Sequence, residues 1–156
     1  YFTHFFYHTT FKKTFSFFLL MTTVMCFGTF DMVHKGHLDY FAQAKKYGEY
    51  LIVVVARDLN VLRIKGKPAL RPETERLASV QAVPLVDKAV LGNTDDLLHV
   101  IQDEKPDIIC LGYDHAVSEH TLRTLLDARN IHSEIKRMSP YLPHLYKTSL
   151  INQRSQ

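Results

Sequence analysis

The segment GTFDMVHKGH, from Gly28 to His37, combines residue types that can bind and polarise phosphate groups. A β-rich apolar run ends at Gly28, and an amphipathic segment begins near His34. The first backbone N–H groups of a helix lack partners and lie at the positive end of its dipole, so they attract anions. Gly36 lets a phosphate approach the backbone closely. His34 and His37 share one face of a helical turn, where both imidazoles can donate hydrogen bonds to phosphate oxygens.

Two histidines at this spacing have other interpretations. The chain has nine histidines, so an HxxH pair can arise by chance. Such a pair can also bind a metal ion, but no third ligand follows at a useful spacing, and we expect no protein-held metal. The position of the pair after a strand, in a glycine-flanked turn and before a helix favours phosphate chemistry.

Three cationic residues outside this segment and one carboxylate within it are further candidates for the site. Lys65 and Lys67 stand in the polar stretch RIKGKP, where lysines are usually solvated charges. Arg76 could simply pair with Glu73, three residues earlier on a helix. Asp31 could accept hydrogen bonds from loop N–H groups, which is a structural role.

From residue 21 the chain alternates β-rich runs with amphipathic segments, which predicts one α/β domain at residues 21–156. We expect a Rossmann-like parallel five-stranded sheet with helices on both faces. The expected strands are 22–27, 50–56, 86–91, 107–111 and 132–138. The expected helices are 37–47 (with Gly48 as its C′ glycine), 72–83, a segment capped by Asn93 or Thr94 that runs to 104, 118–130, and one opened by Thr148.

Residues 57–71 are expected to form a loop. In such a sheet, ligands bind beyond the carboxyl ends of the strands. The expected loops at that edge are 28–37, 57–71, 112–118 and 138–148. Asp114 lies in one of them, where a turn role is as good an interpretation as a ligand contact.

The amino-acid composition excludes several classes of protein. The chain has 156 residues, 46% of them hydrophobic, and a net charge of +3, which is too small to indicate a nucleic-acid binder. Two cysteines cannot form a disulfide framework, so a reducing, cytoplasmic location is expected. No membrane partner is expected.

Residues 1–20 differ from the rest, because they hold nine of the 18 aromatic residues and no Asp, Glu, Gly or Pro. Three interpretations compete: a signal peptide or anchor, an amphipathic surface helix, and translated upstream sequence with Met21 as the natural start. The apolar run is about 13 residues long, short of the roughly 20 that span a bilayer. We favour the last alternative and expect a non-domain extension.

The motif resembles that of the cytidylyltransferase-like nucleotidyltransferase superfamily. The hallmark GT(F/Y)D…HxGH is matched by Gly28, Thr29, Phe30, Asp31, His34, Gly36 and His37. The resemblance continues through YLIVVVARD, RIKGKP, PETER and PDIICLGYDH to about residue 151. It implies an enzyme that transfers a nucleoside monophosphate from a nucleoside triphosphate to a phosphorylated acceptor and releases pyrophosphate.

The resemblance also implies roles for individual residues. The catalytic set would be His34, His37, Lys65 and Arg76. The nucleotide-binding set would be Gly28, Thr29, Phe30, Gly36, Lys67, Asp114, Thr148 and Ser149, although YKTS around the last two matches the family only loosely. Mg²⁺ would bind mainly through the nucleotide phosphates.

Two subfamilies fit. Archaeal-type FAD synthetases, which join ATP and FMN, are closer in VVARD, KGKP and KPDII, but they often carry C-terminal cysteines that are absent after Cys110. Glycerol-3-phosphate cytidylyltransferases use CTP, but GYDH here departs from their GHDW. The aromatic segment 138–148 could stack on a flavin or pack on the last helix. FAD synthesis is preferred, CTP-dependent transfer is the alternative, a non-catalytic nucleotide-binding module is the second alternative, and a homodimer is possible.

Overall fold

The computed structural model describes residues 21–141, and the expected helix at Thr148 lies outside that range. Its centre is a five-stranded, all-parallel sheet in the order β3-β2-β1-β4-β5. The strands are β1 (Thr23–Gly28), β2 (Tyr50–Val55), β3 (Lys88–Leu91), β4 (Ile108–Leu111) and β5 (Glu134–Arg137). The predicted fold class and the parallel sheet are therefore confirmed.

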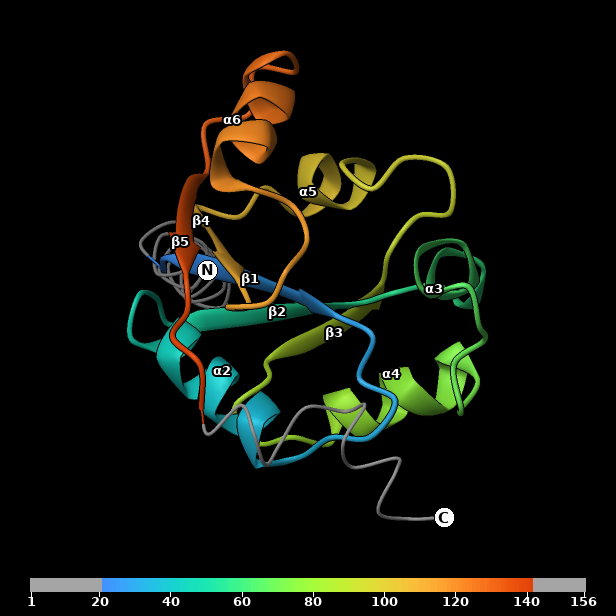
Figure 1. Ribbon diagram of the computed structural model, residues 1–156. Helices are drawn as coiled ribbons and strands as arrows, with labels where there is room; N and C mark the ends of the chain where they lie inside the picture. The colour runs from blue at the N-terminus through green and yellow to red at the C-terminus, as the bar shows by residue number, and fades with distance from the viewer. Residues whose placement is uncertain (1–20, 142–156) are drawn as a thin grey trace, which may run out of the picture.

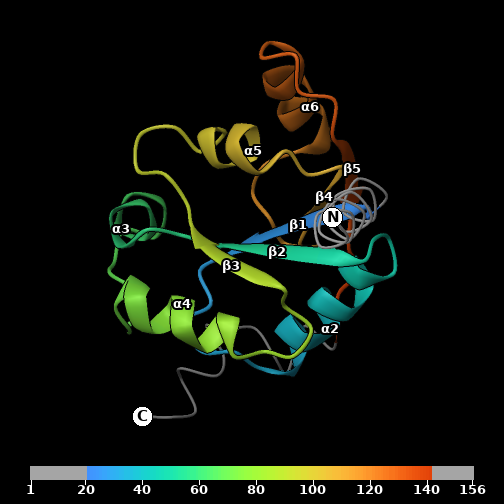
Figure 2. The same cartoon turned by 180° about the vertical axis from the view of Figure 1, so that it is seen from behind.

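Helices cover both faces of the sheet, as expected (Figure 1 and, from behind, Figure 2). The helices are α2 (Lys35–Lys45), α3 (Asp58–Lys65), α4 (Glu73–Gln81), α5 (His99–Glu104) and α6 (Glu119–Asp127). α2 and α4 pack on one face, while α5 and α6 pack on the other. No helix within residues 21–141 is long and apolar enough to cross a membrane.

The central strands are buried because they are apolar on both sides. Five consecutive residues of β2, from Leu51 to Val55, are buried, and so are all four residues of β4. Alternate side chains of β1 enter different cores: Val24 and Cys26 face α2 and α4, and Met25 faces α5 and α6. This two-sided burial explains why near-continuous apolar runs predicted these strands well.

Local capping explains several helix ends. Ser118 Oγ accepts a hydrogen bond from the Thr121 N–H (3.0 Å) and caps α6, as the sequence predicts. After α6, Asn130 adopts a left-handed conformation with φ 55°. These two residues bound the predicted segment, although the α-helix itself ends at Asp127.

The structure corrects the prediction for residues 57–71. The segment is not a loop throughout, because α3 occupies Asp58–Lys65 and ends at Gly66, whose φ is 69°. Most of its apolar side chains are exposed, and only Asn60 and Val61 are buried, so no amphipathic pattern is visible in the sequence.

Two other local predictions are also wrong. Neither Asn93 nor Thr94 caps α5, which begins only at His99; their carbonyls accept hydrogen bonds from α3 instead. Gly48 has no positive φ. It is required for space, because a Cβ there would lie 2.5 Å from the Thr22 carbonyl oxygen.

Candidate active site

The loop between β1 and α2 is shaped by an aromatic ring. Phe30 has φ 54° and is only 3% exposed. Its ring lies over Gly28, where a Cβ would come within 2.5 Å of it, and packs against Phe41 and His37 at centroid distances of 5.4 and 5.0 Å. Phe30 was expected to contact the nucleotide, but its side chain belongs to the core. Its strained backbone fixes the turn that carries the histidines.

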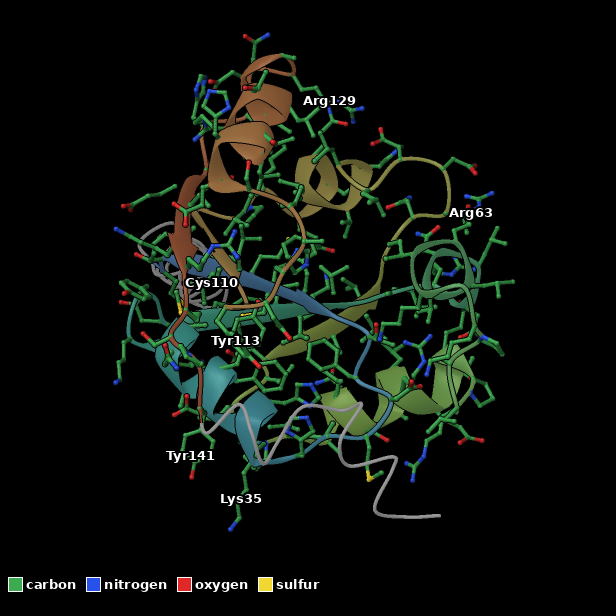
Figure 3. All side chains as sticks on the ribbon, in the orientation of Figure 1. Lys35, Arg63, Cys110, Tyr113, Arg129 and Tyr141 are labelled. Atoms are coloured by element: carbon green, nitrogen blue, oxygen red, sulfur yellow. The ribbon has the colours of Figure 1, made fainter. Side chains whose placement is uncertain are left out.

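His34 and His37 lie together at the start of α2, as the spacing predicts. Their rings are stacked, with centroids 3.8 Å apart and an interplanar angle of 23°. His34 is the N-cap residue, and its Nδ1 accepts a hydrogen bond from the Gly36 N–H (3.1 Å). In the neutral ring this places the proton on Nε2, which can donate to a ligand. Lys35, between them, points away from the protein (Figure 3).

Both histidines are held neutral. Burial lowers the pKa of His34. Burial, together with the charge of His34 and, more weakly, that of Lys65, lowers the pKa of His37 to about 3. The site therefore disfavours positive charge on the imidazoles until an anion balances it.

Lys65 is the last residue of α3 and Lys67 follows Gly66, and both side chains are exposed. The charge of Lys65 weakly lowers the pKa of His37. The start of α2 offers backbone N–H groups and imidazole donors to an anion, and Lys65 adds a positive charge whose effect extends to His37.

Arg76 is placed inside the protein, with no exposed surface. Its guanidinium donates to the carbonyls of Thr29 (2.6 Å), Ala56 (2.8 Å) and Arg71 (3.0 Å), and it pairs with Asp58 at 2.6 Å. Its donors are thus engaged by the loops that follow β1 and β2, rather than directed to a phosphate.

The pairing of Arg76 with Glu73, one of the interpretations of the sequence, is wrong. Glu73 instead pairs with Arg57 and accepts a hydrogen bond from the Asp58 N–H (2.8 Å). Asp31 takes the expected structural role, because it accepts hydrogen bonds from the N–H groups of Leu70 (3.0 Å) and Arg71 (3.5 Å).

The loop after β4 is held by an arginine that the sequence reasoning missed. Arg137, the last residue of β5, donates to the carbonyls of Gly112 (3.0 Å), His115 (3.4 Å) and Val117 (2.8 Å). Asp114, in the same loop, is exposed. Arg137 also pairs with the Glu119 carboxylate at 3.2 Å. Nothing in the motif signals Arg137, since most of its partners are main-chain groups.

The structure thus places His34, Gly36 and His37 together at the start of α2. Gly28 and Thr29 lie at and just after the end of β1, Lys65 ends α3, and Asp114 lies in the loop after β4. Lys67 is nearby in sequence but has no described contact. Thr148 and Ser149 lie outside the described residues. Among residues 21–141, no group of three or more His, Cys, Asp or Glu side chains could hold a metal ion.

Comparison with known proteins shows the family of the chain. Residues 25–154 match the family described as Cytidylyltransferase-like, and the chain belongs to that family. It is a nucleotidyltransferase enzyme. A FAD synthase from Thermoplasma acidophilum is 40% identical over 134 residues, which cover 86% of this chain and 94% of the relative. A FAD synthase from Archaeoglobus fulgidus is 46% identical over 114 residues, covering 73% and 82%.

Solved structures show the same fold. A lipopolysaccharide core biosynthesis protein from Thermoplasma volcanium is 40% identical, with a TM-score of 0.74, and the match covers 78% of this chain and 98% of that one. A pantoate–β-alanine ligase from Francisella tularensis, at 14% identity and a TM-score of 0.53, shares the fold.

Proposed function

We propose that the chain is an FMN adenylyltransferase, which makes FAD from ATP and FMN. The observation that carries the proposal is the stacked His34–His37 pair at the N-terminus of α2. Relatives of 40–46% identity over most of the chain are named FAD synthase, which supports ATP and FMN as the substrates. The site's geometry supports nucleotidyl transfer in general, so the choice of these two substrates rests on the relatives.

The reaction needs positioning and charge neutralisation. An oxygen of the FMN phosphate forms a bond to the α-phosphorus of ATP, and the bond from that phosphorus to the bridging oxygen breaks as pyrophosphate leaves with the electron pair. The N–H groups at the start of α2 bind phosphate, and the imidazoles of His34 and His37 donate to the oxygens of the α-phosphate as charge grows there. Lys65 and Lys67 neutralise the triphosphate, and Asp114 contacts the nucleoside from the β4 side.

Arg76 belongs in this scheme as a positioning residue. Its bonds to the Thr29 and Ala56 carbonyls hold together the segments that follow β1 and β2. The first segment leads to the histidines, and the second leads through α3 to the lysines. Thr148 and Ser149 remain proposed phosphate contacts from the resemblance alone.

Magnesium would reach the site on the nucleotide. The described residues at the start of α2 are hydrogen-bond donors, and Lys65 and Lys67 are cationic, which suits phosphate rather than a divalent cation. Mg²⁺ held by the nucleotide would supply neutralisation of the triphosphate charge.

The domain at residues 21–156 is supported by the family match over 25–154. A cytoplasmic location and a homodimer stay predictions.

The test is pyrophosphate release from ATP or CTP with Mg²⁺, each crossed with FMN and glycerol-3-phosphate. We expect release with ATP and FMN. Release with CTP and glycerol-3-phosphate alone would contradict the proposal and favour the cytidylyltransferase alternative.

The variant His37→Ala separates an enzyme from a binding module. We expect it to lower kcat at least about 100-fold and to change ATP affinity, measured by calorimetry, by less than about tenfold, because the backbone N–H groups of α2 remain. His99→Ala is the matched control, since His99 is exposed on α5 and should leave both values unchanged. If turnover survives in His37→Ala, the assigned role of this histidine is wrong.

A further inference from the structure

Helix α3 contributes little to the core and is held mainly by polar contacts. Of its eight residues, only Asn60 and Val61 are buried. The Asn60 side chain donates a hydrogen bond to the Asn93 carbonyl (2.7 Å), and Arg63 donates to the Thr94 carbonyl (3.1 Å). A short helix with so little packed apolar surface depends on such contacts for its stability and its orientation.

The first residues of α3 and α4 cap each other's helix. The N-cap residues, Arg57 and Pro72, make no side-chain cap of their own. Instead, Glu73 Oε2 accepts from the Asp58 N–H (2.8 Å), and Asp58 Oδ2 accepts from the Glu73 N–H (3.1 Å). We call these two hydrogen bonds the crossed caps. Each carboxylate satisfies an N–H group at the positive end of the other helix, and the two helices lie next to each other in both views (Figures 1 and 2).

Two arginines bind the remaining carboxylate oxygens. Arg57 donates to Glu73 Oε1 (2.9 Å), and Arg76 donates to Asp58 Oδ1 (2.6 Å). These hydrogen bonds lower the pKa of both carboxyl groups, so both caps carry a negative charge at neutral pH. Because Arg76 also donates to carbonyls that follow β1 and β2, the crossed caps connect the start of α3 to the two central strands.

The other end of α3 carries a lysine of the candidate site. Lys65 is the last residue of the helix, and its charge weakly lowers the pKa of His37. Residues 59–72 contain four Lys or Arg residues and no Asp or Glu, so the crossed caps join the two ends of a wholly basic segment. A tilt of α3 at its start would therefore move the charge of Lys65 with no carboxylate inside the segment to restrain it.

We propose that Asp58 and Glu73 are positioning residues that hold α3 against α4 and so keep the charge of Lys65 at the phosphates of the bound nucleotide. The proposal rests on the proposed function, because it assumes that the triphosphate lies at the start of α2. It assigns to the two carboxylates an effect on nucleotide affinity that is transmitted through Lys65, without contact to the nucleotide.

The variant Glu73→Ala removes the cap of α3 and leaves every partner of the buried Arg76 in place. Glu75→Ala is the matched control, because Glu75 is an exposed carboxylate in the same helical turn. In hydrogen–deuterium exchange without nucleotide, we expect the amides of α3 to exchange at least about tenfold faster in Glu73→Ala than in the wild type. Glu75→Ala should leave their exchange unchanged.

A double-mutant cycle with Lys65→Ala tests the route to the nucleotide. In calorimetry with ATP, we expect Glu73→Ala to raise Kd at least about fivefold when Lys65 is present and less than about twofold when it is replaced. A general loss of structure would raise Kd by similar factors in both backgrounds.

Unchanged exchange of α3 in Glu73→Ala, or equal rises of Kd in the two backgrounds, would overturn the proposal. Exchange is measured without nucleotide and Kd without FMN, so neither depends on adenylyl transfer. A chain that binds ATP but releases no pyrophosphate with FMN would contradict the proposed function alone. A wild-type chain that binds no ATP would contradict both the proposed function and the effect assigned to Lys65.

Discussion

The imidazole of His37 stays neutral in the folded protein at pH values below about 6.5, where the same residue in the unfolded chain is mostly charged. Its pKa is about 3 in the folded protein, against about 6.5 when exposed, because burial and the charge of His34 disfavour the proton. The unfolded state therefore binds more protons between these values, and stability falls as the pH falls below about 6.5. We expect His37 to contribute a loss of at most about 2 kcal/mol in the free energy of unfolding between pH 7 and pH 5.

Urea unfolding of the wild type and of His37→Gln at both pH values measures this loss. Glutamine cannot titrate, so its stability should depend less on pH, and subtraction removes the contribution of the other histidines. Equal pH dependence in the two proteins would show that His37 is not held neutral in the way its surroundings indicate.

At the scale of elements, Arg76 joins α4 to the ends of β1 and β2. Its donors reach three carbonyls and Asp58 from a side chain with no exposed surface. Lysine has one ammonium group and cannot reach all of these partners, so Arg76→Lys leaves buried carbonyls unpaired. We expect a loss of about 3–5 kcal/mol in urea unfolding. Arg57→Lys, at a partly exposed pair, should cost less than about 1 kcal/mol, and a similar loss in both would contradict this role.

The sequence predicts those helices and strands whose buried residues give a visible pattern of apolar side chains. The strands and α6 follow from apolar runs and caps, to within about two residues at most ends. α3 was missed because Leu59, Leu62 and Ile64 are exposed and give no amphipathic face. In the site, the histidine pair was predicted from spacing. The contacts of Arg76 and Arg137 were not, because most of their partners are backbone carbonyls, which only the folded chain brings together with the carboxylates of Asp58 and Glu119.

At the scale of the whole molecule, the candidate site lies at the carboxyl ends of two neighbouring strands of the sheet. The histidines follow β1, and Asp114 follows β4, so a nucleotide that contacts both does so in the folded state only. ATP with Mg²⁺ at a hundred times its Kd should raise the free energy of unfolding by about 2.7 kcal/mol. For a domain of this size, that is a rise of roughly 10 °C in Tm.

Thermal unfolding with ATP and with CTP at equal concentrations measures both the stabilisation by bound nucleotide and the preference for adenine over cytosine. ATP is expected to raise Tm clearly more than CTP does, because the proposed reaction uses ATP. His37→Ala should keep most of the rise, since the N–H groups of α2 still bind the phosphates. An equal rise in Tm with both nucleotides would mean that the site does not select adenine on binding. Selectivity for ATP would then have to arise in the chemical step. A larger rise with CTP would contradict adenylyl transfer and favour a CTP-dependent enzyme.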